Sequence, residues 1–159
     1  MANTPPPFIP GAFVGAAHHY RARVYFEDTD LSGIVYHANY LRYMERARSD
    51  MLRIAGIDQR AAMDAGDGSW AVTDLTIKYR RPAKLDDDLL VVSTVEAVRG
   101  ASVIIAQRIL RGTDTLSGET LTDGQVTAAF LSPEGRPRRQ PAGWADRFTA
   151  IMNGEKIPC

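Results

Sequence analysis

The sequence predicts an α+β protein in which a five-stranded antiparallel sheet wraps around one long central helix. Two observations support this fold class. One stretch of helical periodicity follows the first strand-like segment, and four strand-like segments then follow with no comparable helix between them. Helices and strands that are segregated in this way favour an antiparallel sheet over alternating βαβ units. The long helix must bury its apolar stripe, and the concave face of a curved sheet offers the place.

The first strand is predicted from a strict alternation of side chains that begins at Tyr20. Four residues alternate with more polar neighbours, as in a half-buried strand: Tyr20, Ala22, Val24 and Phe26. A polar turn follows from Asp28 to Gly33. Gly33 can take a backbone conformation that other residues resist, which suits a tight turn.

The long helix is predicted from Asn39 to Ala55, a length of roughly 25 Å at 1.5 Å per residue. Asn39 is the expected N-cap, and Gly56 the expected stop. Five residues recur at steps of three and four along one face: Tyr40, Met44, Ala47, Met51 and Ile54. This stripe is the part of the helix that we expect the sheet to bury.

The remaining elements are strands joined by short connections. Residues 59–68 predict a loop or a short irregular helix, and Arg99-Gly100-Ala101 predicts a tight hairpin turn. The four expected strands cover residues 70–80, 88–98, 101–111 and about 124–131. Together with the first strand they make the five-stranded sheet.

Domain organisation follows from length and composition. The 159 residues, 45% of them hydrophobic and 24% charged, leave little room for two domains. Residues 1–19, with His18 and His19, predict a flexible Pro-rich arm, and residues 20–132 the folded domain. Residues 133–159 predict a tail with a short amphipathic helix that carries Trp144, Phe148, Ile151 and Met152.

Charge and cysteine content exclude several classes of function. The 19 basic residues balance 19 acidic ones, which disfavours a protein that coats nucleic acid. A single cysteine, Cys159, excludes an internal disulfide framework and a cysteine-based zinc cluster. No apolar run reaches membrane-spanning length, and the N-terminus lacks the basic residues of a signal peptide. We therefore expect a cytoplasmic protein without a membrane span.

The turn before the long helix concentrates the groups that can do chemistry. Asp28, Asp30 and His37 fall within ten residues, and the helix opens directly after His37. The first N–H groups of a helix lack internal partners and can stabilise an oxyanion. A carboxylate beside them can activate water or attack a carbonyl. This combination suits acyl transfer.

Residues Tyr25 to Tyr40 read Tyr-Phe-Glu-Asp-Thr-Asp-Leu-Ser-Gly-Ile-Val-Tyr-His-Ala-Asn-Tyr. This run resembles the signature of the hotdog-fold acyl-CoA thioesterases of the 4-hydroxybenzoyl-CoA thioesterase superfamily. It is most similar to their Tol-Pal-associated (YbgC-like) branch. Tyr43 to Arg48 and Tyr79 to Ala83 resemble the same branch, and the likeness covers roughly Arg21 to Leu131 in element order.

The resemblance implies a function and a site. It implies hydrolysis of acyl-CoA to a free acid and CoA, with Asp30 as general base or nucleophile and His37 as its catalytic partner. It further implies a homodimer or homotetramer with sites at subunit interfaces and neither metal nor cofactor. The substrate contacts that we derive from it are Gly33, Val35, Tyr36, Asn39 and Arg81.

Simpler interpretations stand beside these roles. An Asp in a Gly-containing turn usually bonds nearby backbone, and Asp28 keeps that interpretation. His37 can be a helix-start histidine satisfied by backbone groups. Glu45 has Arg42 and Arg48 three residues to either side, which predicts a solvated or interfacial ion pair in place of a catalytic role. A metal site built from Asp28, Asp30 and His37 is weak, because no further His or Cys joins them.

A basic cluster and a rival function complete the alternatives. Lys78, Arg80, Arg81 and Lys84 can face the phosphates of CoA, with Arg81 as the candidate contact. We favour a solvated strand end that Asp86, Asp87 and Asp88 neutralise. The rival function is a non-catalytic acyl- or protein-binding module of the same fold. A hotdog dehydratase lacks support, because the motif is of the thioesterase type.

Overall fold

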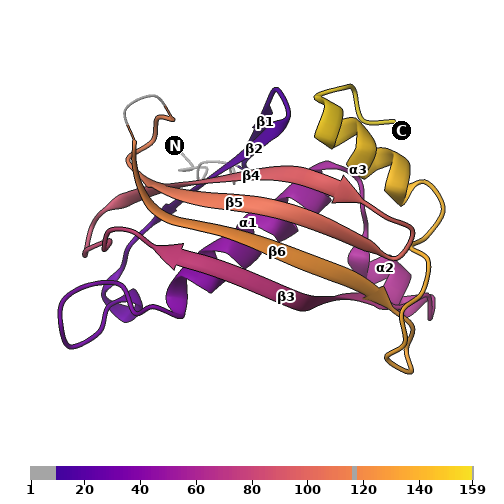
Figure 1. Ribbon diagram of the computed structural model, residues 1–159, viewed down its shortest axis with the longest axis horizontal. Helices are drawn as coiled ribbons and strands as arrows, with labels where there is room; N and C mark the ends of the chain where they lie inside the picture. The colour runs from indigo at the N-terminus through magenta and orange to yellow at the C-terminus, as the bar shows by residue number, and fades with distance from the viewer. Residues whose placement is uncertain (1–9, 116–117, 159) are drawn as a thin grey trace, which may run out of the picture.

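Six antiparallel strands curve around the long helix α1 in the computed structural model, which describes residues 10–115 and 118–158 (Figure 1). The strand order is β1-β2-β4-β5-β6-β3, so β1 and β3 form the two edges. The strands are β1 (Ala12–Val14), β2 (Ala17–Arg23), β3 (Ser69–Tyr79), β4 (Asp88–Val98), β5 (Ser102–Arg111) and β6 (Glu119–Leu131). The helices are η1 (Phe26–Asp28), α1 (Asn39–Ile54), α2 (Gln59–Asp64) and α3 (Trp144–Asn153). The predicted α+β fold is confirmed, with one strand more than the sequence predicts.

The additional strand comes from the N-terminal segment. The prediction of a flexible arm is wrong for residues 12–19, because β1 and the start of β2 form a hairpin at the edge of the sheet. His18, expected in the arm, is fully buried and lies 2.7 Å from Asp50 of α1. This contact joins residues 32 positions apart, so no local pattern shows it. Residues 1–9 of the predicted arm lie outside the described residues.

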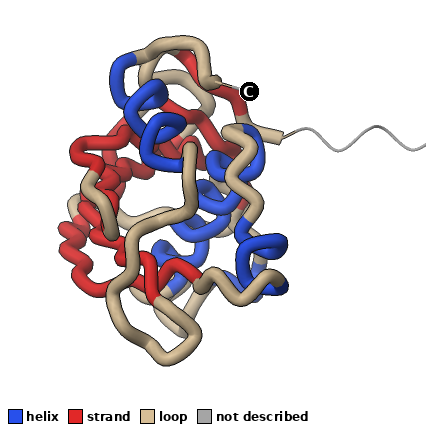
Figure 2. The backbone as a smooth tube through the Cα atoms, turned by 90° about the vertical axis from the view of Figure 1, so that its right-hand side faces the viewer, coloured by secondary structure: helices blue, strands red, loops and turns tan. Residues whose placement is uncertain are grey.

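The predicted central helix is confirmed to within one residue. Its predicted apolar face is buried from Tyr40 through Met44 and Ala47 to Met51, against the concave side of the sheet. The predicted N-cap is wrong: Ala38 occupies that position, and the Asn39 side chain bonds Asp28 instead. Figure 2 shows the strands curving around the helices.

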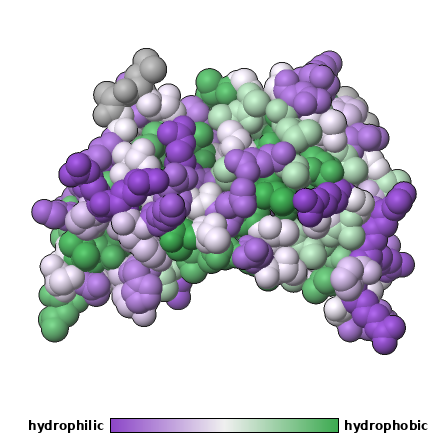
Figure 3. Space-filling model, viewed as in Figure 1, coloured by the Kyte–Doolittle hydropathy of each residue, from purple (hydrophilic) through white to green (hydrophobic). Residues whose placement is uncertain are grey.

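The predicted strands differ from the observed ones mainly at their ends. Phe26, expected on the buried face of the first strand, lies in η1 and is 82% exposed, because the strand ends at Arg23. The predicted hairpin is confirmed by the N–H of Arg99, which donates to the carbonyl of Ser102 at 2.8 Å. β6 begins five residues before the predicted Gly124. Figure 3 shows hydrophilic and hydrophobic residues intermixed over this face of the molecule.

Two apolar clusters fill the space between helix and sheet. One surrounds Tyr43 and Met44 in the first half of α1, below the loop that carries Asp30. The other surrounds Met51 at the opposite end, where α3 adds Trp144 and Phe148. Both clusters hold the helix ends against the sheet. Within the described ranges, no helix is long and apolar enough to cross a membrane.

Candidate active site

The loop between β2 and α1 places Asp30 by its own hydrogen bonds. The N–H of Asp30 donates to the carbonyl of Ile34 at 2.9 Å, and the N–H of Gly33 donates back to the carbonyl of Asp30 at 3.0 Å. Gly33 has φ of +82°, a left-handed conformation that L side chains rarely adopt. The glycine predicted from the sequence therefore shapes the turn, and it does not line the cleft described below.

Asp28 anchors this loop to the start of α1. Its buried carboxylate accepts hydrogen bonds from the N–H of Tyr25 at 2.8 Å and from the side-chain amide of Asn39 at 3.0 Å. The N–H of Tyr36 donates to the carbonyl of Asp28 at 2.9 Å. Burial and the neighbouring Asp28 charge raise the pKa of Tyr43. Asp28 and Asn39 thus orient the loop, and the structure gives Asn39 no position in the cleft.

Asp30 itself is exposed and held as a carboxylate. One oxygen, Oδ1, accepts the Ser32 hydroxyl at 2.5 Å and the Ser32 N–H at 2.8 Å. These bonds, led by the hydroxyl, lower the pKa of Asp30, and the nearby His37 ring lowers it further. In the part of the chain that the structure describes, Oδ2 has no hydrogen-bond donor. That oxygen is free to act on water or on an electrophile.

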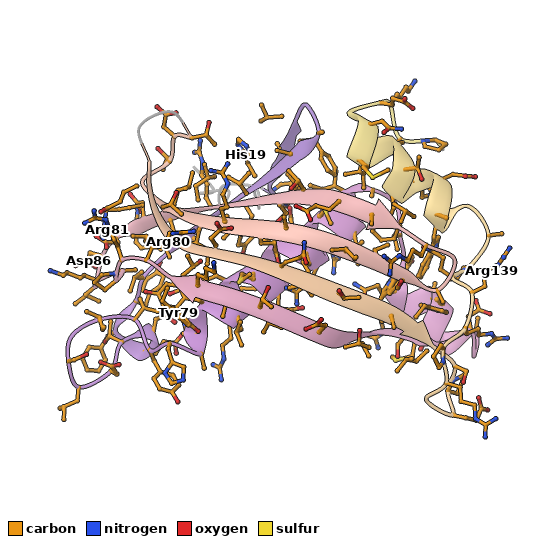
Figure 4. All side chains as sticks on the ribbon, in the orientation of Figure 1. His19, Tyr79, Arg80, Arg81, Asp86 and Arg139 are labelled. Carbon is orange, nitrogen blue, oxygen red and sulfur yellow. The ribbon has the colours of Figure 1, made fainter. Side chains whose placement is uncertain are left out.

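An open cleft of about 400 Å³ brings four of the predicted site residues together: Asp30, Val35, His37 and Arg81. Its other lining residues are Ile34, Tyr40, Tyr79, Arg80 and Pro82. Figure 4 shows Tyr79, Arg80 and Arg81 at one end of the sheet. Val35 lines the cleft as a buried wall, whereas Tyr36, another predicted contact, lies beside it.

His37 lies at the entrance to α1 between two aromatic rings. Its ring centroid is 4.5 Å from that of Tyr36 and 6.4 Å from that of Tyr79. The Tyr79 hydroxyl donates to the His37 carbonyl at 2.7 Å. Among the described residues, no acceptor partners the backbone N–H of His37 or of Ala38. Unpartnered N–H groups at the start of a helix can stabilise an oxyanion, and His37 is the one of these two residues that lines the cleft.

Tyr79 and Tyr40 are site residues that the sequence reasoning missed. The two rings meet edge to face with centroids 5.5 Å apart, and the Tyr40 hydroxyl accepts the N–H of Ala83 at 3.0 Å. Tyr79 stands at the end of β3, 42 residues after His37. In the sequence, the one feature that pointed to Tyr79 was its position as the first residue of the Tyr79 to Ala83 segment, which carries part of the family resemblance. The aromatic pair forms the wall of the cleft opposite the Asp30 loop.

The basic residues beside the cleft are paired, but not with the acids that the sequence predicts. The Nε of Arg81 lies 2.8 Å from Glu119, and Arg80 lies 3.4 Å from Asp123. Of the predicted partners, Asp87 pairs with Arg111 and Asp88 with Arg23. The pairs differ from the prediction because β6 runs beside β3 and brings its own carboxylates, Glu119 and Asp123, next to the two arginines. The Arg81 side chain stays 66% exposed, with further N–H donors for a ligand.

Two other predictions concern an ion pair of Glu45 and a metal site. The Glu45 carboxylate accepts the Ser49 hydroxyl at 2.7 Å, and within residues 10–115 and 118–158 neither Arg42 nor Arg48 comes within 4.0 Å of it. Within one copy of the described chain the predicted ion pair of Glu45 does not form, because Arg48 turns inward to Gln107, and an interfacial pair stays a prediction. No group of three or more His, Cys, Asp or Glu side chains in the described chain is arranged to hold a metal ion.

Known proteins are similar to this chain in sequence and in fold. The family model described as the thioesterase superfamily matches residues 32–117. The acyl-CoA thioesterase YbgC of Haemophilus influenzae is 38% identical over 122 residues, which cover 77% of this chain and 90% of the relative. The acyl-CoA thioester hydrolase YbgC of Escherichia coli O6:H1 is 39% identical over 127 residues, or 79% and 91%. A probable thioesterase from Bartonella henselae superposes with a TM-score of 0.71 at 36% identity, covering 79% of this chain and 99% of that structure.

Proposed function

The chain belongs to the thioesterase superfamily and hydrolyses acyl-CoA to a free acid and CoA, and we propose that Asp30 is its catalytic carboxylate. One observation carries this proposal. The cleft is lined by Asp30, a carboxylate with a free oxygen, and by His37, whose backbone N–H at the start of α1 has no acceptor among the described residues. These are the groups that acyl transfer to water requires.

The mechanism follows from what each group offers. The thioester carbonyl lies against the start of α1, where the N–H groups of His37 and Ala38 stabilise the oxyanion, at ~3–4 kcal/mol for a good donor. Oδ2 of Asp30 takes a proton from water, and that water attacks the carbonyl carbon. The C–S bond then breaks and the CoA thiolate leaves. His37 positions the water or protonates the thiolate.

A covalent route uses the same atoms. Oδ2 of Asp30 attacks the carbonyl carbon, the C–S bond breaks, and an aspartyl anhydride forms. Water then hydrolyses the anhydride and restores the carboxylate. The lowered pKa of Asp30 keeps it ionised for either route at neutral pH. In both routes Arg81 binds a phosphate of CoA, and Val35 and Tyr40 wall the acyl end of the cleft.

Replacement of Asp30 by Asn tests this assignment. The change keeps the shape of the side chain but removes the base, so we expect kcat for acyl-CoA to fall about 10²- to 10⁴-fold. Release of free thiol from a panel of acyl-CoAs measures the rate. Asp86→Asn is the matched control, because Asp86 is an exposed carboxylate at the same end of the sheet outside the cleft (Figure 4).

Two results would redirect the proposal. Undiminished hydrolysis by Asp30→Asn would contradict the role of Asp30. If the unaltered protein binds acyl-CoA without releasing thiol from any member of the panel, the non-catalytic binding module is the better interpretation. The panel also ranks acyl chains by length and by aromatic or aliphatic character.

We further propose that the chain works in the cytoplasm as a homodimer or homotetramer associated with the Tol-Pal system. The resemblance to the YbgC-like branch supports the location and the association. The sheet supports the assembly, because β3 is an edge strand of 11 residues, and an open edge can pair with another chain. Light scattering after size exclusion measures the mass in solution, and a strict monomer would contradict the oligomer.

A further inference from the structure

The Arg81 guanidinium at the cleft is held by a carboxylate from the neighbouring strand. Nε of Arg81 lies 2.8 Å from Oε1 of Glu119, the first residue of β6. The other oxygen of Glu119, Oε2, accepts a hydrogen bond from Nε of Arg111 at 3.0 Å. We call Glu119 together with these two arginines the Glu119 bridge. It joins Arg81, which lines the cleft at the end of the sheet in Figure 4, to Arg111, which does not line it.

Arg111 fixes the other side of the Glu119 bridge. Its side chain is 32% exposed, and its remaining nitrogens bond inside the chain. Nη2 donates to the carbonyl of Pro82 at 2.7 Å, and Nη1 pairs with Asp87. Burial by itself would lower the pKa of Arg111, but the bonds to Glu119 and Asp87 raise it. Arg111 therefore holds both Glu119 and the segment directly after Arg81.

The main chain of Arg81 is also fixed by β6. The N–H groups of Arg80 and Arg81 both donate to the carbonyl of Leu121, at 2.8 and 3.2 Å. Leu121 is the extra residue of a bulge, where the pairing of β6 with β5 passes from Thr122 to Thr120. Because β6 lies between β3 and β5, pairing of the β3 edge with a second copy leaves these contacts in place.

The Glu119 bridge leaves the outer nitrogens of Arg81 available. Among the described residues, no carboxylate or carbonyl accepts from Nη1 or Nη2 of Arg81. A planar guanidinium binds a phosphate through parallel N–H donors, which requires the correct orientation. A free arginine side chain has many rotamers and loses them when it binds. A carboxylate that orders the side chain beforehand removes part of that cost.

We propose that Glu119 is a positioning residue for CoA recognition, which presents the outer N–H groups of Arg81 to a phosphate of CoA, and that Arg111 holds Glu119 in place. The inference rests on the proposed function for the identity of this ligand. An exposed ion pair adds little to stability, so we assign the bridge to the orientation of Arg81. The negative charge of Glu119 also opposes a phosphate. Orientation and repulsion therefore predict opposite changes when Glu119 is removed.

Replacement of Glu119 by Ala separates the two effects. Loss of orientation should raise KM for an acyl-CoA about 3- to 10-fold with kcat unchanged, whereas relief of repulsion would lower KM. The same acyl group on pantetheine, which has no phosphate, is the second substrate, and its KM should not change. Glu119→Gln keeps an oxygen beside Nε of Arg81 and should raise KM for acyl-CoA less than Glu119→Ala does.

A double variant tests whether Glu119 acts through Arg81. Arg81→Ala should raise KM for acyl-CoA at least as much as Glu119→Ala, and adding Glu119→Ala to it should cause no further rise. Arg81→Lys keeps the charge but loses the planar guanidinium, so it should also raise KM for acyl-CoA alone, which serves if Glu119→Ala does not fold.

Asp88→Ala is the matched control. Asp88 pairs with Nε of Arg23 at 2.9 Å, with exposure similar to that of the Glu119 pair, and neither residue lines the cleft. Its KM should stay unchanged. Calorimetric titration of CoA into Asp30→Asn, with and without Glu119→Ala, repeats the comparison without hydrolysis, and we expect about 3- to 10-fold weaker binding in the double variant.

Three results would overturn the proposal. They are an unchanged or lowered KM for acyl-CoA in folded Glu119→Ala, an equal rise with the pantetheine thioester, and a further rise when Glu119→Ala is added to Arg81→Ala. The calorimetric comparison holds whether or not Asp30→Asn slows hydrolysis. Failure of the catalytic assignment of Asp30 is therefore distinguishable from failure of the role of Glu119.

Discussion

Replacing Asp50 by Ala should release the N-terminal hairpin from the central helix. Asp50 is buried on α1, and one of its oxygens, Oδ2, accepts two hydrogen bonds from the N-terminal segment. The donors are the N–H of Gly11 at 2.9 Å and Nε2 of His18 at 2.7 Å. A carboxylate only accepts hydrogen bonds, so Nε2 of His18 carries the proton. The hairpin formed by β1 and β2 is thus tied to α1 through a single carboxylate.

The expected loss of stability follows from these two bonds. Asp50→Ala leaves the buried Nε2–H of His18 and the partly buried N–H of Gly11 without an acceptor, and each unsatisfied donor costs about 1–3 kcal/mol. Taking the middle of that range for both donors, we expect the free energy of unfolding to fall by about 4 kcal/mol. Gly11 reinforces the argument, because an added Cβ would stand 2.7 Å from the same Asp50 oxygen and 2.4 Å from the His19 carbonyl. The N-terminal segment therefore lies this close to α1 because residue 11 has no side chain and because the Asp50 carboxylate accepts its N–H.

Urea denaturation at pH 7, followed by circular dichroism, measures this change. With an m-value of about 1–3 kcal/mol/M, the midpoint should fall by more than 1 M. Asp64→Ala is the control, since Asp64 is an exposed carboxylate at the end of α2 and should change stability by less than about 0.5 kcal/mol. A loss below about 1 kcal/mol in Asp50→Ala would refute the reasoning, because it would mean that the buried donors find water or other acceptors at no cost.

Three further predictions concern pH and the site. Burial lowers the pKa of His18 below 6.5, so the unfolded chain binds the proton more readily, and the free energy of unfolding falls as the pH drops from about 6.5 toward the folded pKa. Urea titrations at pH 7.5 and pH 5 measure this fall, which should be smaller in His18→Gln than in the unaltered protein. An equal fall in the two proteins would contradict the prediction. Ser32→Ala removes the hydroxyl that lowers the pKa of Asp30, so the acid limb of kcat/KM should move to higher pH, and an unmoved limb would exclude Asp30 as its source. Tyr79→Phe loses the bond to the His37 carbonyl and should lower kcat/KM about fivefold with an unchanged circular dichroism spectrum, whereas full activity would show that this bond has no role.

The elements that could be predicted from the sequence are those with local, periodic patterns. The apolar stripe of α1 is buried from Tyr40 to Met51, and its spacing predicted both ends of the helix to within one residue, although the last stripe residue, Ile54, is 38% exposed. β4, predicted at residues 88–98, has those bounds, because it lies between two strands and is apolar through most of its length. The edge strand β3 also came within a residue, although its alternation breaks at a bulge between Val72 and Asp74.

The elements that could not be predicted depend on partners far away in the chain. His18 reads as a polar residue in a Pro- and Gly-rich segment, and only Asp50, 32 residues later, makes its burial favourable. Asn39 reads as an N-cap, yet the buried carboxylate of Asp28 draws its side chain away from the helix N–H groups. In both cases a tertiary hydrogen bond overrides the local preference of the residue.

The candidate site divides in the same way, and the division has a chemical meaning. Asp30 and His37 belong to one loop, whose internal bonds to Ser32 and Ile34 set the position and ionisation of the carboxylate. Local sequence was therefore sufficient to predict that the two proposed reactive groups lie in one loop. The opposite wall, from Tyr79 to Arg81, depends on how β3 lies against β6 and α1, and its ion pairs were predicted wrongly. In the proposed mechanism the loop thus carries the chemistry of the thioester, whereas the opposite wall, which the sheet positions, contacts the substrate.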